Sequence, residues 1–441
     1  MTYPPEFASV DIYLEECVQF FKKYQYIFCY QNTDVLVENV LANISVSNLG
    51  DLDVFNADFK IEDLRAGDEY FDEFFAKLDK LKVLLDDVDM NEYDYDFDAP
   101  LSPKKRYEIV NLAKEVGDLC EASNCDIVVD FGAGMGYLDQ ILFKLKGYKV
   151  LGLDSNRNFL DGALKRQAKY HEDSTTAVKF VKQKITEDSS TTIEQCLQET
   201  FPGHGKVCIV GLHACADLTV ESMLTFLKMA DARSMAVMPC CYHRMSQTGG
   251  IFKYFPLSDS LKACFKKHEA SKIMGVTFLR LATQAFESHL DLYKMAFDLL
   301  SRAVLQVYAR KHNFTIHRKK RKAVKLKKYN DFDSYLIEAA TNGFKLTPIS
   351  ESRSYSNDDK TTNNFNLDEI RLLWREFSED MTFMKAAIFI LMQSKLQLLV
   401  ENFVMLDRLV FLRERGVMKC SYKKVYAAEA SARCLVLMAV K

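Results

Sequence analysis

The chain has 441 residues, 27% of them charged, and a formal net charge of −3 at pH 7. This length permits two or three domains with a large buried core. The overall charge excludes a generally basic protein, so any signal for a nucleic-acid partner must be local.

Cysteine usage and the start of the chain indicate an intracellular protein. The twelve cysteines are scattered and form no C-x-x-C pair, which is typical of a reducing compartment, where cysteine acts as a small buried hydrophobe. The first residues, MTYPPEFASVDIYLEE, carry acids where a secretory signal needs basic and then apolar residues. No run of eighteen apolar residues occurs, so we expect no membrane segment and a cytoplasmic or nuclear location.

Residues 1–85 predict a helical N-terminal extension, because apolar residues recur there at helical spacing. The next segment, residues 86–100, begins with DDVDMNEYDYDFD, and its seven acidic residues repel one another. This composition favours a solvated linker. A lid over a basic surface is the alternative.

Ordered structure resumes after residue 100. We expect a helix with Ser102 as its N-cap and Pro103 at its first position. Lys104 and Lys105 then lie in the first turn, where the helix dipole disfavours cations. The two lysines either face solvent or bind an anion, and we include them in a candidate substrate pocket.

The segment from Ile127 to Asp154 organises the chain and reads IVVDFGAGMGYLDQILFKLKGYKVLGLD. A short β-branched run predicts a buried strand, a glycine-rich turn follows, and a helix-period segment begins at Tyr137. Because glycine has no Cβ, such a turn lets a ligand touch the backbone. A second apolar run ends in Asp154, whose carboxylate can accept hydrogen bonds from both ribose hydroxyls. The order strand, turn, helix, strand and acid predicts a nucleotide-binding unit.

The spacing of the glycines indicates which nucleotide. Dinucleotide-binding turns have the pattern G-x-G-x-x-G, whereas this chain has D-x-G-x-G-x-G. That order resembles motif I of the S-adenosylmethionine methyltransferases. We therefore predict S-adenosylmethionine as cofactor, with a purely structural turn as the alternative. The predicted cofactor-binding residues are Asp130, Gly132, Gly134, Gly136 and Asp154.

Three further buried strands are predicted at residues 178–181, 207–212 and 235–238, with helical segments between them. This alternation predicts an α/β fold with a mostly parallel, doubly wound, Rossmann-like sheet in residues 101–246. Ligands of such sheets bind beyond the carboxyl ends of the strands. The polar side chains expected at that edge are His213, Asp217, Cys240, Cys241, Tyr242 and His243.

Beyond residue 246 the alternation stops. Residues 247–376 predict a mostly helical insertion, and residues 377–441 predict a long helix and a last strand that completes the sheet. The insertion contains eight cations in eleven residues from Arg318 to Lys328. Such a run is typical of a solvated helix face or a nuclear localisation signal. It can alternatively neutralise RNA phosphates.

The CCYH segment after the fifth strand allows three interpretations. A thiolate could attack C6 of a pyrimidine whose carbon 5 is to be methylated. Cys240 and Cys241 could bind a metal together with His213, Cys215 and His243. We favour the third interpretation, in which the cysteines line a substrate pocket and no metal is bound, because adjacent residues of a strand point in opposite directions.

Several motifs together resemble the methyltransferase-like protein 25 family: SPKKRYEI, VVDFGAGMGYL, GLHACADLT, PCCYHRMS, LLVENFVMLDRLVFLRERG and SARCLVLMAVK. The matching pieces run from about residue 101 to the end of the chain. CCYHR and LHACADL are also similar to CCHHR and KHLCG of the tRNA 2′-O-methyltransferases that act on the acceptor stem. One departure is Ala216, which stands where relatives commonly have glycine and which narrows the space beside the cofactor.

This resemblance implies a Rossmann-like methyltransferase fold that uses S-adenosylmethionine. We expect direct methyl transfer, with RNA as the leading substrate and contacts from Arg318 to Lys328. A protein methyltransferase and a non-enzymatic binding protein with the same fold are the alternatives. The candidate proton acceptors are His213, Asp217, Tyr242 and His243.

Overall fold

The computed structural model of the chain describes residues 3–86, 88, 100–284, 291–319, 331–349, 365–427 and 433–441. Most of the predicted acidic linker, and residues 320–328 of the basic stretch, lie outside these ranges. The chain forms two compact units. The first comprises Met1–Lys23, Lys80–Ser288 and Gln397–Lys441, and the second comprises Tyr24–Asp79 and His289–Leu396.

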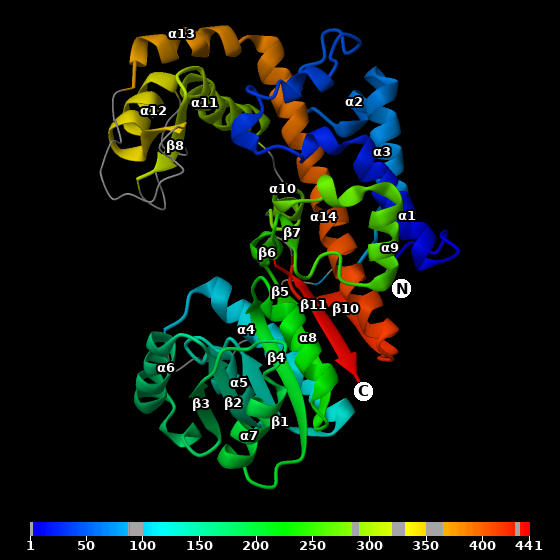
Figure 1. Cartoon of the computed structure of the whole chain (residues 1–441), viewed down its shortest axis with the longest axis vertical. Helices are drawn as coiled ribbons and strands as arrows, with labels where there is room; N and C mark the ends of the chain where they lie inside the picture. Colours follow the sequence, from blue (N-terminus) through cyan, green and yellow to red (C-terminus); the bar gives the residue numbers. More distant parts are fainter. Residues whose placement is uncertain are drawn as a thin grey trace. The chain divides into compact units, whose positions relative to one another are not determined.

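A seven-stranded sheet forms the centre of the first unit (Figure 1), in the order β10-β11-β5-β4-β1-β2-β3. Strands β1 to β5 are parallel, whereas β11 is antiparallel to both of its neighbours, β5 and β10. The strands are β1 (Cys125–Phe131), β2 (Lys149–Asp154), β3 (Val178–Lys182), β4 (Lys206–Ala214), β5 (Ala232–Pro239), β10 (Lys419–Lys424) and β11 (Leu435–Val440).

The strand order reverses at β1, which lies between β2 and β4. Asp130 of β1 pairs with Gly152 of β2 and with Val210 of β4. At the end of the next pair, Ala214 of β4 lies opposite Pro239 of β5. The carboxyl ends of these strands therefore share one edge of the sheet, which is where doubly wound sheets bind ligands.

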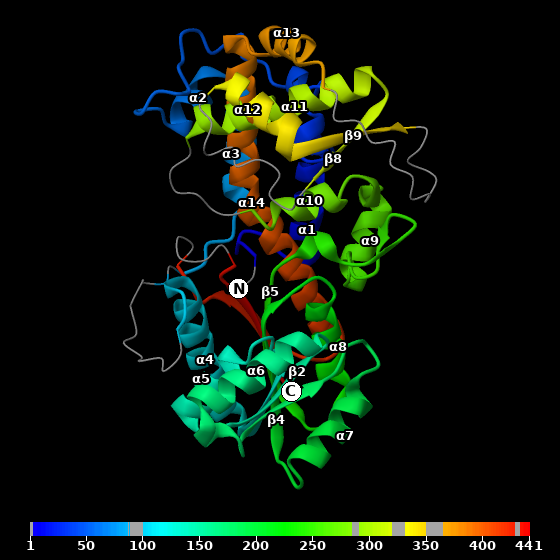
Figure 2. The same ribbon diagram turned by 90° about the vertical axis from the view of Figure 1, so that its left-hand side faces the viewer.

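Five helices surround the parallel strands: α4 (Pro103–Ser123), α5 (Tyr137–Lys146), α6 (Arg157–Tyr170), α7 (Ser190–Thr200) and α8 (Leu218–Lys228). The helices α4 and α5 pack together on one side of the sheet, and α7 and α8 pack together on the other (Figure 2). As predicted, Ser102 caps α4 by accepting a hydrogen bond from the Lys105 N–H at 3.4 Å, and Pro103 begins the helix.

The rest of the first unit packs around aromatic side chains. It contains α1 (Val10–Lys23), α9 (Asp259–His268), α10 (Val276–Leu281) and the small hairpin of β6 (Gln247–Thr248) and β7 (Ile251–Phe252). Phe21 of α1 meets Phe278 edge-to-face with ring centroids 5.0 Å apart, and Phe403 at 5.2 Å. All three rings are almost completely buried.

The second unit is mainly helical. It contains α2 (Ile61–Gly67), most of α3 (Glu69–Leu81), α11 (Leu292–Lys311), α12 (Phe332–Glu338) and α13 (Leu367–Phe377), with a hairpin of β8 (Phe314–Arg318) and β9 (Phe344–Pro348). The only tryptophan of the chain, Trp374 in α13, stacks on Phe332 of α12 with ring centroids 4.2 Å apart. This contact joins two helices of the unit.

The longest helix, α14 (Asp380–Glu414), contributes residues to both units. It is the one described helix that is long and apolar enough to cross a membrane, and 72% of its most apolar window is buried within the protein. A single helix of this kind is weak evidence for a membrane span, because the core helix of a soluble protein passes the same test. Three charged residues, Glu401, Asp407 and Arg408, are each at most 3% exposed on it.

The sheet confirms the predicted fold class. The predicted strands occur at the expected places along the chain, and the last strand returns from the C-terminus as β11. Strand β10 was not predicted, because it contains three lysines in six residues and does not have an apolar pattern. The predicted domain boundaries remain a prediction. Each compact unit combines separate segments of the chain, so neither unit corresponds to one continuous range.

Candidate functional site

The glycine-rich turn between β1 and α5 has a left-handed backbone at three positions. The φ angles are 82° at Gly132, 58° at Gly134 and 70° at Gly136. Glycine adopts such angles without the steric cost that a Cβ brings. The alternating glycines of the sequence therefore match the conformation of the turn.

The surroundings of two of these glycines differ. Among the described residues, a Cβ at Gly134 would meet no atom closer than the Gly132 carbonyl oxygen at 3.9 Å, whereas a Cβ at Gly136 would overlap the Phe180 ring. Gly134 thus borders open space that a ligand can occupy. Gly136 is instead required by the packing of the turn on β3.

Asp154 holds this turn from the end of β2. Its carboxylate accepts the Gly134 N–H at 3.0 Å and the Asn156 N–H at 2.7 Å. Asp154 is half-buried, so part of the carboxylate remains accessible. The predicted ribose ligand is therefore also the residue that shapes the glycine turn.

Asp130 has a different environment from the one we expected of a cofactor ligand. It is 2% exposed and lies beside Asp139 of α5, which is completely buried. Burial raises the pKa of both carboxyls, and the charge of Asp139 raises that of Asp130 further. Asp130 is therefore a buried carboxyl and does not offer an open carboxylate to a ligand.

Two cationic side chains, Lys105 and Arg166, lie over the ring of Tyr137, the first residue of α5. The Lys105 Nζ lies 3.7 Å and the Arg166 guanidinium carbon 4.0 Å from the centroid of Tyr137. Burial and the nearby Arg166 lower the pKa of Lys105. Within the described part of the chain, the buried Nε and Nη2 of Arg166 have no hydrogen-bond partner. The group is an incompletely neutralised positive site beside the glycine turn.

The neighbouring Lys104 has a simpler role. Its side chain is 61% exposed, and Nζ lies 3.8 Å from a carboxylate oxygen of Glu108. Of the two lysines that we included in the substrate pocket, the structure therefore places only Lys105 in the cationic group on Tyr137.

His213, at the end of β4, is oriented by a buried acid. Its Nε2 lies 3.3 Å from Oε2 of Glu108, a residue of α4 that is 4% exposed. The His213 side chain is 37% exposed and its φ of 59° is unusual for a residue with a Cβ. If Nε2 donates to Glu108, Nδ1 carries the free lone pair that can accept a proton.

Two other candidate proton acceptors, Asp217 and His243, already have hydrogen-bond partners within the protein. Asp217 accepts the Ser246 N–H with both carboxylate oxygens, at 3.0 and 3.2 Å. His243 is half-buried, and its Nδ1 lies 3.4 Å from Thr283 Oγ1. Burial lowers the pKa of His243, as do the charges of Arg280 and Arg244. Both residues secure the segment that follows β5.

Tyr242 is the clearest departure from the predicted site. It is 1% exposed, and its hydroxyl donates to Glu401 Oε1 at 3.2 Å. Burial, together with the charge of Glu401, raises the pKa of Tyr242 well above its usual value. A buried phenol that already donates to a carboxylate does not accept a proton from a substrate, so we remove Tyr242 from the candidate acceptors.

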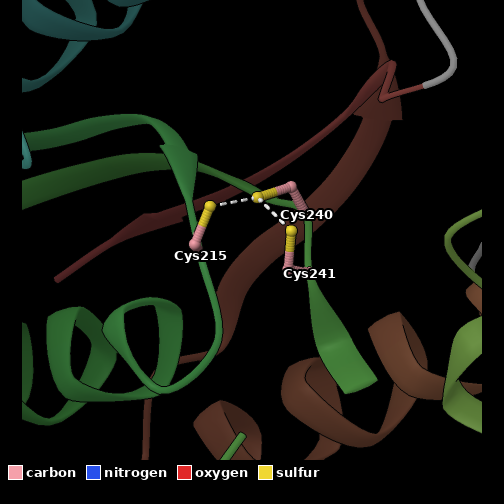
Figure 3. Close-up of side chains that lie close together, drawn as sticks. All are labelled: Cys215, Cys240 and Cys241. Atoms are coloured by element: carbon pink, nitrogen blue, oxygen red, sulfur yellow. Dashed lines mark hydrogen bonds between the residues drawn. The ribbon is translucent and has the colours of Figure 1, made fainter. Parts of the chain in front are cut away.

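Three cysteines meet at the ends of β4 and β5 (Figure 3). The sulfur of Cys240 lies 2.6 Å from that of Cys215 and 3.7 Å from that of Cys241. Hydrogen bonding from Cys240 lowers the pKa of Cys215 to about 6, while the bond with Cys215 and burial raise that of Cys240. All twelve cysteines of the chain are free thiols.

The comparison with known protein families concerns the same part of the chain. Residues 104–248 match the family model described as a methyltransferase domain. This match supports methyltransferase activity for these residues. They span α4, the five parallel strands and the CCYH segment, and a methyltransferase domain implies S-adenosylmethionine as cofactor.

Two solved methyltransferases are among the structures to which this chain was matched. The methyltransferase domain of bacterial CtHen1 is 15% identical, with 30% of this chain and 67% of that chain covered and a TM-score of 0.23. A SAM-dependent methyltransferase from Aquifex aeolicus is 14% identical, with 38% and 82% covered and a TM-score of 0.22. At these TM-scores the assignment rests on the family model.

The residues of the methyltransferase domain fit the cofactor. The open side of Gly134 lets a ligand approach the backbone, and the half-buried Asp154 places a carboxylate at the end of the neighbouring strand. The bound cofactor would supply a methyl group on a positively charged sulfur.

Sequence reasoning missed Glu108 and Arg166. Glu108 lies within the motif SPKKRYEI, four residues after Lys104. An acid that follows a basic first turn could have been recognised as a candidate partner of a site residue. Arg166 lies in an ordinary amphipathic helix with several other cations. Only its approach to Tyr137 distinguishes it.

Proposed function

We propose that this chain is an RNA methyltransferase of the methyltransferase-like protein 25 family, located in the cytoplasm or nucleus. The observation that supports an RNA substrate is the cationic group formed by Lys105, Arg166 and Tyr137 beside the cofactor turn. Incompletely neutralised cations at the ligand edge of a sheet favour an anion. RNA supplies phosphates that such cations can bind.

In this proposal the enzyme acts mainly by positioning. The acceptor atom lies in line with the transferable methyl group, and proximity supplies much of the rate enhancement. His213 is the proton acceptor we favour, because it is partly exposed at the carboxyl end of β4. Glu108 is a positioning residue, since its buried carboxylate orients the imidazole.

The basic stretch is a second proposed contact to RNA. Arg318 is exposed at the end of β8, and the Lys319 Nζ donates to the Thr341 carbonyl at 2.6 Å. The remaining cations lie outside the described residues. We expect that serine at Lys319, Lys320, Arg321 and Lys322 flattens the dependence of RNA affinity on salt, because fewer counterions are released on binding.

The substrate class is tested with tritiated S-adenosylmethionine and fractionated RNA and protein from cells that lack this protein. Label that enters RNA only when the purified chain is added supports the proposal. Label that enters protein instead identifies a protein methyltransferase. Absence of label in both fractions, with cofactor binding intact, supports a non-enzymatic role.

A double variant distinguishes the two anions that Lys105 and Arg166 could bind, an RNA phosphate and the carboxylate of the cofactor. Lys105→Ala with Arg166→Ala should weaken RNA binding and reduce the salt slope by about two, one unit for each phosphate contact. The affinity for S-adenosylhomocysteine should not change. A loss of cofactor affinity with unchanged RNA binding would show that these cations bind the carboxylate of the cofactor. Lys206→Ala, an exposed lysine at the amino end of β4, is a matched control.

A further inference from the structure

The three sulfur atoms at the ends of β4 and β5 form a compact group. The sulfurs of Cys215, Cys240 and Cys241 all lie within 4.8 Å of one another. Cys240 is buried, Cys241 is half-buried and Cys215 is exposed. Figure 3 shows Cys215 on one segment and the adjacent pair on the other, with the Cys240 sulfur between the other two.

The chain turn after β5 explains how two adjacent cysteines can contribute to one group. Strand β5 ends at Pro239, and Cys241 precedes a short 3-10 turn with φ −81° and ψ 64°. The alternation of side chains along a strand therefore no longer applies at this pair. Our reason for separating the two cysteines on sequence was wrong, because it assumed that the strand continued.

We propose that Cys215, Cys240 and Cys241 bind one Zn²⁺ ion as three thiolate ligands. Thiolates are preferred zinc ligands at about 2.3 Å, and two sulfurs of a tetrahedral site are then about 3.8 Å apart. The Cys240 and Cys241 sulfurs are 3.7 Å apart and already match this distance. Cys215 must move away from Cys240 by about 1.2 Å to match it, and Cys215 is the exposed member of the group.

The fourth position of this zinc site has no ligand from the described residues. The nearby histidines are engaged elsewhere, His213 with Glu108 and His243 with Thr283. Three protein ligands with an open fourth position are typical of zinc sites that bind water or a substrate. This open position lies at the carboxyl edge of the sheet, so the ion can polarise an oxygen or sulfur atom that reaches the same edge. The zinc site does not depend on the choice of RNA as substrate.

The test uses the full chain, reduced with a phosphine and stripped of metal by a chelator. Titration with Co²⁺ should reach one equivalent and produce the charge-transfer absorption of thiolate-bound cobalt, and Zn²⁺ should displace it. Cys240→Ser should weaken Co²⁺ binding by more than the roughly 10–100-fold that loss of an outer partner causes. The matched control is Cys196→Ser, which changes a half-buried cysteine outside the group and should bind Co²⁺ normally.

Circular dichroism must first show that both variants are folded. If Cys240→Ser does not fold, Cys215→Ser replaces it, because Cys215 is exposed and its loss leaves the core intact. Two results would overturn the proposal. The reduced chain could fail to bind one equivalent of Co²⁺, or the variant could bind it as tightly as the natural chain. A Cys215–Cys240 disulfide formed with hydrogen peroxide, in a chain that binds no metal, would identify a redox pair instead.

Discussion

Gly134 and Gly136 have the same left-handed backbone, yet the two residues should respond differently to alanine. Gly134→Ala adds a methyl group to open space, so the protein should fold with a backbone cost of about 1–2 kcal/mol and bind S-adenosylhomocysteine weakly. Gly136→Ala also forces the Phe180 ring to move and should cost about 2–5 kcal/mol of stability. Thermal unfolding and calorimetry separate the two effects. Equal stability of the variants would contradict this account of the turn.

Asp154 links the turn to the proposed cofactor site. Asp154→Ala removes the acceptor of the Gly134 and Asn156 N–H groups and the predicted acceptor of the ribose hydroxyls. We expect S-adenosylhomocysteine to bind more weakly by about 1–3 kcal/mol, the scale of hydrogen bonds to a charged group. Calorimetry measures this difference. Asp161→Ala, which changes a half-buried acid on α6 that pairs with Arg157, should bind the cofactor normally.

The proton acceptor can be distinguished by comparing two conservative variants. His213→Gln removes the imidazole that Glu108 orients and should lower kcat by roughly 10²–10⁴-fold if it acts as general base. Tyr242→Phe removes one buried hydrogen bond, which should cost about 1 kcal/mol of stability but leave kcat within a few-fold. Single-turnover methyl transfer provides the measurement. A large loss of kcat in folded Tyr242→Phe would return Tyr242 to the list of acceptors.

At the scale of elements, α14 holds loops of the sheet unit through buried polar groups. Its Glu401 accepts hydrogen bonds from Tyr242, Gln397 and Arg433. Its Asp407 accepts the Leu257 and Ser258 N–H groups at 2.8 Å and the Ser258 hydroxyl at 2.6 Å. These contacts explain why a helix with a membrane-like composition carries charges in its buried part.

The pH dependence of stability should report on Asp407. Burial raises its pKa to about 6, above the roughly 3.9 of an unfolded chain. Between these values the native state binds more protons than the unfolded state. The contribution of Asp407 to the free energy of unfolding is therefore full below about pH 4 and falls as pH rises to about 6, by up to about 3 kcal/mol.

Asp407→Asn should remove this component, so the free energy of unfolding should vary less with pH between about 4 and 6. At pH 7 the variant should be less stable by about 1–3 kcal/mol, because the amide cannot accept all three hydrogen bonds of the carboxylate. Urea unfolding at several pH values measures both effects. Identical pH profiles for the two proteins would show that Asp407 does not titrate in this range.

At the scale of the whole molecule, the methyltransferase domain is not continuous in sequence. Strand β11 pairs with β5, for example Leu437 with Val237 and Val440 with Ser234, and it also pairs with β10. Without the C-terminal segment, the buried strand β5 would become an open apolar edge. The matched region 104–248 is therefore an incomplete folding unit.

We expect a fragment of residues 100–248 to be insoluble or to lack a cooperative unfolding transition. The full chain should unfold cooperatively, because β11 covers β5 only in the complete sheet. S-adenosylhomocysteine should stabilise the full chain, because a ligand that binds only the folded state shifts the unfolding equilibrium. Circular dichroism and thermal unfolding test this expectation. A soluble fragment that binds the cofactor with the affinity of the full chain would contradict it.

The amino-acid sequence by itself determined the elements whose signals are local. Ser102 and Pro103 mark the start of α4, the alternating glycines mark the turn after β1, and Asp154 marks the end of β2. Each of these signals arises from backbone preference or apolar periodicity within a few residues. Such preferences do not depend on distant parts of the chain, so the order of the parallel strands and the cofactor turn could be predicted.

Only the tertiary structure decided which side chains meet. Glu108 reaches His213 across 105 residues, Tyr242 reaches Glu401 across 159, and Cys215 reaches Cys240 across 25. Each pair depends on how helices and loops pack against the ends of the strands. The sequence pattern could not show that Tyr242 is buried, because burial is set by the elements that cover a residue. Packing therefore buries Tyr242, a predicted proton acceptor, and brings Cys240 and Cys241 together with Cys215.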